Sequence, residues 1–364
     1  MSDSSKVLFA TMAYARYEAS QTLPEKFDRL LKKSGIKEKL KGKKVAIKMH
    51  VGDRIGYSTI PPIFVRKLVQ FVQDAGAECF ITDHYVADRH PEHRGYAESS
   101  LGCPVLDAAS YFGKYFYPKD VDFKKLKNVD ISGLIHDADF LIDFSHVKGH
   151  GSCGFGGACK NIAMGCVTDR TRHQIHGLEG GIVWDESKCN HCKKCIGACN
   201  HQANHFSESG HYHMNYHHCT LCQHCIKVCP QGALTMDSHD YQDFQTGMAI
   251  TTKTVLDTFE PGNVYYINVL TQITALCDCW GMTTPSLVPD IGIMGSDDIV
   301  AIERASIDQI KMEDLIQSGI PVGYELGEQG HLFERLHGKN PYIQLDKLME
   351  QGLGTDNYDL VIVK

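Results

Sequence analysis

The stretch that decides the fold is VAIKMHVGDRIGYSTIPPIFVRKLVQFVQDAGAECFIT, residues 45–82. It begins and ends with short apolar runs that are typical of buried strands. Between them, a segment opens at Pro61, carries apolar side chains at helical spacing from Val65 to Val72, and stops at Gly76. Strand, helix and strand in this order predict a βαβ unit with two parallel strands.

The same alternation continues on both sides of this unit. We therefore predict an α/β fold, with a mainly parallel sheet and helices on both of its faces. Two further helices are predicted at Met248 to Phe259 and from Asp297 to about Ile316. Further strands are predicted at Val7 to Met12, Phe140 to Phe144, Val264 to Leu270, Ile291 to Met294 and Leu360 to Val363.

Residues 185–237 interrupt the alternation and hold eight of the fifteen cysteines and eight of the twenty histidines. We interpret them as an inserted α+β module, so that residues 1–184 and 238–364 are the first and second parts of the α/β domain. An insertion between two separate domains is the alternative.

Composition restricts the class of protein. With a net charge of -7, the chain has no basic excess for binding nucleic acid. It also has no apolar run of the roughly 20 residues that a membrane-spanning helix needs. Because no export signal is visible, we expect a cytoplasmic protein. Disulfides rarely persist in the cytosol, so the fifteen cysteines point to metal or redox chemistry.

Two cysteine motifs in the module share one spacing, three cysteines at two-residue gaps and a fourth after three residues. This is the spacing of bacterial two-cluster ferredoxins, in which the fourth cysteine of each motif binds the other cluster. We therefore predict two [4Fe-4S] clusters. The predicted ligands are Cys189, Cys192, Cys195 and Cys229 for one cluster, and Cys219, Cys222, Cys225 and Cys199 for the other.

Zinc is the alternative metal, because it also binds Cys-x2-Cys pairs. Zinc would not explain a third and fourth cysteine repeated in both copies. The first motif departs from the usual pattern, because Asn200 stands where the second motif has Pro230. The many histidines of the module either tune the clusters or belong to a solvated hairpin.

A second group of polar residues follows the predicted strand at Phe144, in FSHVKGHGSCGFGGACKNIAMGC, residues 144–166. Ligands of open parallel sheets bind at such strand ends. A further metal or organic cofactor is possible here, and a glycine-rich crossover without function is the alternative. The predicted catalytic residues are Lys160, His146, His150 and His173, with His176 as an alternative to His173, and the predicted cofactor-binding residues are Gly156, Gly157, Asn161, Asp83 and His84.

Other predicted strands also end in polar residues, at His50, at Asp83 and His84, and near Cys277-Asp278-Cys279. In a parallel sheet these ends converge on one face. Cys277 and Cys279 are metal ligands, a redox pair or two buried structural thiols.

Taken together, KMHVGD, the 144–166 loop, the two cysteine motifs, CDCWG and PDIGIMGSDDIVAIERAS resemble the domain of unknown function 362 family of iron–sulfur proteins. The resemblance implies two [4Fe-4S] clusters and no established reaction. A fainter similarity to the lactate racemase family implies a nickel-pincer nucleotide tethered to Lys160, with acid–base histidines at His146 or His150. Here Cys159 is an extra residue before the lysine, and a redox-neutral racemase needs no clusters.

Our leading hypothesis is an iron–sulfur oxidoreductase that relays electrons to a small molecule or second cofactor at the strand-end face, near one of the clusters, with a redox partner protein. One alternative is a ferredoxin-type carrier or maturation factor that docks a partner enzyme. The other is a racemase-like or epimerase-like enzyme with a lysine-tethered nickel cofactor.

Overall fold

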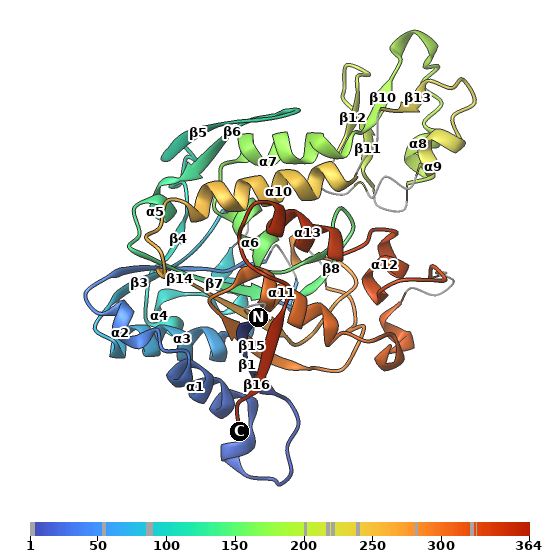
Figure 1. The fold of residues 1–364 in the computed structure, drawn as a ribbon. Coiled ribbons are helices and arrows are strands. Elements are labelled where there is room, and N and C mark those ends of the chain that lie inside the picture. Colours follow the sequence, from blue (N-terminus) through green and yellow to red (C-terminus); the bar gives the residue numbers. More distant parts are fainter. Residues whose placement is uncertain are drawn as a thin grey trace.

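The computed structural model describes residues 4–52, 56–84, 90–199, 202–215, 219, 223–237, 241–280, 283–320, 324 and 326–364. Its centre is an eight-stranded sheet in the order β16-β1-β15-β14-β7-β2-β3-β4 (Figure 1). All neighbours pair in parallel except β15, which is antiparallel to both β1 and β14. The prediction of a mainly parallel sheet is therefore confirmed. The strands are β1 (Ser5–Thr11), β2 (Lys44–Lys48), β3 (Glu78–Asp83), β4 (Val105–Asp107), β7 (Phe140–His146), β14 (Val264–Leu270), β15 (Gly292–Ser296) and β16 (Tyr358–Ile362).

Helices cover both faces of the sheet, as predicted. Strand side chains alternate between the two faces: Phe140, Ile142 and Phe144 of β7 enter one core, and Leu141 enters the other. On the first face, α1 (Leu23–Lys33) and α3 (Pro62–Asp74) pack on β7, where the rings of Phe27 and Phe144 stack. The second face carries α6 (Ala158–Gly165), α10 (Tyr241–Leu256), α11 (Ile299–Asp308) and α13 (Tyr342–Glu350).

Helix α11 is shorter than predicted. It begins after Asp298, whose carboxylate accepts hydrogen bonds from the amides of Val300 and Ala301, and it ends at Asp308. The hairpin of β5 (Phe116–Phe123) and β6 (Leu126–Ser132) was not predicted, because these residues are rich in charge. The other elements are α2 (Lys37–Leu40), α4 (Glu98–Leu101), α5 (Gly133–His136), β8 (Lys148–His150), β9 (Gly154–Gly156), α7 (Asp169–His176) and α12 (Leu332–His337).

The cysteine-rich segment lies at one end of the molecule, beyond α7 and α10 (Figure 1). It has a small core of its own that includes Ile182, Tyr212 and Leu234. The strands that flank it in sequence join one sheet, because β7 pairs with β14 and β1 pairs with β16. Its elements are β10 (Ile182–Trp184), α8 (Lys194–Gly197), β11 (Asn204–Phe206), β12 (Tyr212–Met214), α9 (His224–Lys227) and β13 (Leu234–Met236).

This segment is internally duplicated. Strand β10 pairs with β13 and β11 pairs with β12, and each element of the first half recurs 30 positions later, as β10 does in β12 and α8 in α9. Even the left-handed residue before each short helix recurs, as Lys193 with φ 58° and Gln223 with φ 64°. Among the described residues, no helix is long and apolar enough to cross a bilayer.

Candidate functional site

The carboxyl ends of β2, β3 and β7 meet at one edge of the sheet and open into a pocket. The pocket has about 490 Å³ of empty space, partly open to solvent. Its walls come from the ends of β2 and β3, from β8, α6 and α7, and from the loop after β14. The convergence that the sequence predicted thus brings together segments from residue 48 to residue 279.

Lys48 at the end of β2 is the centre of a buried polar network. Its ammonium lies 2.9 Å from the Asp83 carboxylate and 2.5 Å from the Asn161 amide oxygen, and Lys48 and Asp83 are both almost fully buried. Asn161 also donates to Asp143 at 2.8 Å. A Cβ at Gly165 would lie only 2.1 Å from the Lys48 side chain, so only glycine leaves this lysine its place.

His50 and Asp83 form a second polar unit in the pocket wall. His50 Nδ1 lies 2.8 Å from the Asp83 carboxylate, whereas His50 Nε2 is buried without a hydrogen-bond partner among the described residues. Burial lowers the pKa of His50, and the charge of Asp83 offsets only part of this effect. The ring is therefore neutral near pH 7, with Nδ1 protonated and Nε2 able to accept a proton.

The pocket wall is cationic. Of the described residues that line it, Lys48, Lys148, Lys160 and Arg172 carry positive charge, whereas negative charge comes from Asp83 and from Cys279, whose pKa is lowered to about 6. An anion is therefore the ligand that the wall favours.

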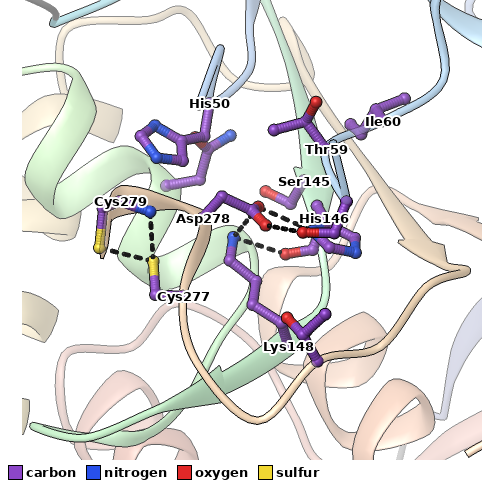
Figure 2. Close-up of polar contacts among 12 residues, drawn as sticks. His50, Thr59, Ile60, Ser145, His146, Lys148, Cys277, Asp278 and Cys279 are labelled. Carbon is purple, nitrogen blue, oxygen red and sulfur yellow. Dashed lines mark hydrogen bonds and ion pairs between the residues drawn. The ribbon is translucent and has the colours of Figure 1, made fainter. Parts of the chain in front are cut away.

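The loop after β14 is fixed to the pocket through Asp278 (Figure 2). The Asp278 carboxylate lies 2.7 Å from His146 Nδ1, 3.5 Å from Lys148 Nζ and 3.2 Å from the Ser58 hydroxyl. The charges of His146 and Lys148 outweigh burial and hold the pKa of Asp278 well below its usual range. His146 Nε2 faces the Thr271 carbonyl at 2.8 Å, so both ring nitrogens are engaged outside the pocket. This geometry makes His146 a positioning residue for the loop.

Two thiols flank Asp278. Cys277 Sγ and Cys279 Sγ are 2.8 Å apart, and Lys160 Nζ lies 3.5 Å from the first and 4.0 Å from the second. Burial would raise the pKa of Cys279, but its hydrogen bond with Cys277 and the charges of Lys160 and Lys148 lower it to about 6. With His150, whose ligand atom lies within 4.8 Å of both sulfurs, the thiols are a possible metal site.

The predicted residues of the 144–166 loop divide into two groups. His150, Lys160 and Asn161 line the pocket, as do Asp83 and His84. Gly156 and Gly157 lie behind the wall, where a Cβ at Gly157 would lie 2.3 Å from the Glu303 carboxylate. Glu303 accepts a hydrogen bond from the first amide of α6, at Ala158, so a protein carboxylate already caps this helix.

On α7, the histidine that the sequence analysis favoured does not face the pocket. His173 is exposed and bonds to the Asp169 carbonyl, whereas Arg172 and His176 line the pocket. The sequence analysis did not identify Arg172 and Lys48 as pocket residues, because only the tertiary structure shows which side of a helix or strand faces the pocket.

The cysteines of the module lie together as well. Four of them, Cys189, Cys192, Cys195 and Cys229, line one hollow with about 340 Å³ of empty space, next to Trp184. They are the four residues predicted for one cluster, three from one motif and the fourth from the other. Such a ring of four thiols has the donor chemistry that a [4Fe-4S] cluster requires.

The second predicted set is described in part. Cys222 lies outside the described residues, whereas Cys199, Cys219 and Cys225 lie within them. The amides of Ala203 and Ala233 donate to Cys199 Sγ at 3.2 Å and to Cys229 Sγ at 3.3 Å, so the fourth cysteine of each motif has the same surroundings. Amide-to-sulfur hydrogen bonds stabilise negatively charged cysteine ligands.

Fold and site together define an α/β protein with a cationic pocket at the carboxyl edge of its sheet. The chain belongs to the family described as "Domain of unknown function (DUF362)", whose model matches residues 45–308. No curated protein matches. Among solved structures, the lactate racemase apoprotein from Thermoanaerobacterium thermosaccharolyticum is similar, with 12% identity and a TM-score of 0.32 over 67% of this chain. The matched part spans about half of that protein, 49% of its chain.

Proposed function

We propose that the protein is an iron–sulfur oxidoreductase that reduces or oxidises a small anionic molecule in the strand-end pocket. The observation that carries this proposal is the pairing of two sites in one chain. One is a ring of four cysteines with the spacing of cluster ligands, and the other is a cationic pocket that contains histidine and thiol side chains. When bound, [4Fe-4S] clusters supply or accept single electrons, delivered by a redox partner protein.

The pocket residues have separate tasks in this proposal. Lys148, Lys160 and Arg172 bind the negative charge of the substrate. Lys48 is held by Asp83 and Asn161, and so keeps the dyad of His50 and Asp83 in place. His50 Nε2 accepts or returns a proton, because electron transfer to or from an organic molecule is accompanied by proton movement. Asp83 orients the ring and stabilises its protonated form.

An electron carrier or maturation factor needs the module alone, so the built pocket favours an enzyme. A racemase-like or epimerase-like enzyme would also use histidine bases, and both His50 and His150 line the pocket. Such a reaction is redox-neutral, and it would proceed unchanged in protein without clusters. Dependence of turnover on the clusters therefore separates the two hypotheses.

The first expected result concerns metal content. Protein purified without oxygen should contain about eight irons and eight acid-labile sulfides per chain, the sum for two cubane clusters. Its absorbance near roughly 400 nm should bleach on reduction. Zinc at the cysteine sites of freshly isolated protein that has not been exposed to oxygen would contradict the iron–sulfur assignment.

The second expected result concerns Lys160. Lys160→Gln should weaken binding of any anionic molecule that copurifies with the protein by about ten- to one-hundred-fold, because a charge-assisted hydrogen bond contributes about 1.5–3 kcal/mol. Iron and sulfide content should not change. Binding is measured by mass spectrometry of the released molecule and by titration with it. Lys114→Gln, at an exposed lysine, is the control. If both variants bound the molecule equally well, the 144–166 loop would have a structural role and no role in binding.

A further inference from the structure

We propose that Cys277 and Cys279 form a redox-active dithiol that holds two electrons at the pocket wall. Their sulfur atoms are 2.8 Å apart, so a movement of roughly 0.8 Å would bring them to the disulfide bond length of about 2.05 Å. The residue between them, Asp278, is fixed by His146 and Lys148 (Figure 2). The Ser58 hydroxyl also donates to Asp278, and together these contacts hold both sulfurs in place.

Cys277 Sγ lies beside two hydrogen-bond donors. The amide of Cys279 lies 3.4 Å from its sulfur, and the ammonium of Lys160 lies 3.5 Å away. Cationic neighbours of this kind are typical of reactive cysteines rather than of inert buried ones. Cys279 lines the pocket, whereas Cys277 is fully buried behind it, so a pocket ligand would meet Cys279 first.

His150 favours a dithiol over a metal site. The backbone amide of Ser152 donates to His150 Nδ1 at 3.1 Å, so this nitrogen carries no proton. The proton of the neutral ring is therefore on Nε2, where it can be donated to Cys277. A ring engaged in this way has no lone pair left for a metal ion.

The charge balance of the site also favours a dithiol over a bound metal ion. One thiolate beside the Lys160 ammonium is neutral as a pair. A divalent metal with two thiolates would leave the ammonium as an unbalanced positive charge in a largely buried site. Other buried thiols lack this arrangement: Cys153 donates to the Phe155 carbonyl, and Cys159 bonds to the Thr252 hydroxyl.

The redox step rests on the proposed function, because the electrons come from the clusters. Reduction of the disulfide breaks the bond between the sulfurs of Cys277 and Cys279. It takes up two electrons, which bound [4Fe-4S] clusters would supply one at a time, and one proton from solvent, and it leaves one thiol and one thiolate beside Lys160. A pair of one-electron donors is thereby matched to a two-electron acceptor beside the substrate.

The test is a thiol titration in the intact chain. Protein is equilibrated without oxygen in mixtures of reduced and oxidised dithiothreitol, quenched in acid, unfolded, alkylated and digested with trypsin. The tryptic peptide 254–304 contains Cys277 and Cys279 and no other cysteine. We expect two populations of this peptide, with both thiols alkylated or with neither, and a ratio that follows a two-electron dependence on potential.

Matched variants complete the test. Cys277→Ser and Cys279→Ser should each lose the unalkylated population, whereas Cys79→Ser, at the other end of β3 from Asp83, should leave the titration unchanged. Full alkylation of both thiols at every potential would overturn the proposal. So would thiols that resist alkylation in the folded protein until a chelator releases one metal ion per chain. Iron and sulfide in the same samples test the clusters separately, because dithiothreitol reaches the dithiol without them.

Discussion

Asp278→Asn is expected to lower the free energy of unfolding by about 3 to 5 kcal/mol, the usual cost of breaking a buried ion pair from one side. Asp278 is almost fully buried and faces His146 and Lys148. Asparagine has nearly the same shape as aspartate, so the loss of stability results from the missing charge and not from a cavity. Urea unfolding under anaerobic conditions measures the effect.

A double-mutant cycle makes this result specific. Lys148→Met should also destabilise the protein. The double variant should lose less free energy of unfolding than the sum of the two single variants, because the charges of Asp278 and Lys148 are then removed together. The control is Asp297→Asn, at an exposed carboxylate, with an effect within about 0.5 kcal/mol. If Asp278→Asn and this control behaved alike, the carboxylate would not be what holds the loop after β14.

Cys229→Ala should remove about half of the iron, and the cluster that is lost should be the one bound by the first motif. The reason is the crossing of ligands, since Cys229 lies in one hollow with Cys189, Cys192 and Cys195. Anaerobic alkylation of the folded protein, followed by mass spectrometry, shows which thiols have lost their iron. Cys189, Cys192 and Cys195 should become reactive, and Cys199, Cys219 and Cys225 should stay protected.

Cys199→Ala is the matched variant in the other half of the duplication. It should expose Cys219 and Cys225 and leave the first set protected. If each variant instead exposed the remaining cysteines of its own motif, every cluster would be bound by a single motif and our pairing would be wrong. Cys103→Ala, at a buried cysteine outside the module, should leave the iron content unchanged.

The local sequence pattern was sufficient to predict the main elements of the fold. The proline-led segment with apolar residues at helical spacing is α3, and the short apolar runs on either side of it are β2 and β3, which pair in parallel. The β5–β6 hairpin was missed because β5 is largely exposed and both strands carry charged residues, which removes the apolar signal of a buried strand. Helix α11 was predicted too long, because helical spacing does not locate the end of a helix.

The candidate site could be predicted less completely. His50, Asp83 and Lys160 each follow a strand or glycine-rich turn, and the parallel order of the strands brought them together. His146 and His150 differ by four positions, yet only His150 lines the pocket, since the ring of His146 bonds to Asp278 and Thr271. The sequence cannot make this distinction, because both partners of His146 are more than 120 positions away from it.

By itself, the sequence determined the α/β class, the cysteine spacing with its predicted clusters, and the edge of the sheet where polar residues gather. These features depend on periodicity and short spacing, which act between residues that are close in the chain. The tertiary structure alone decided that Lys160 meets the two thiols of the loop after β14, that Glu303 caps α6, and that Arg172 rather than His173 faces the pocket. Contacts of this kind depend on how whole helices and strands pack, because a shift of one helical residue changes the direction of a side chain by about 100°.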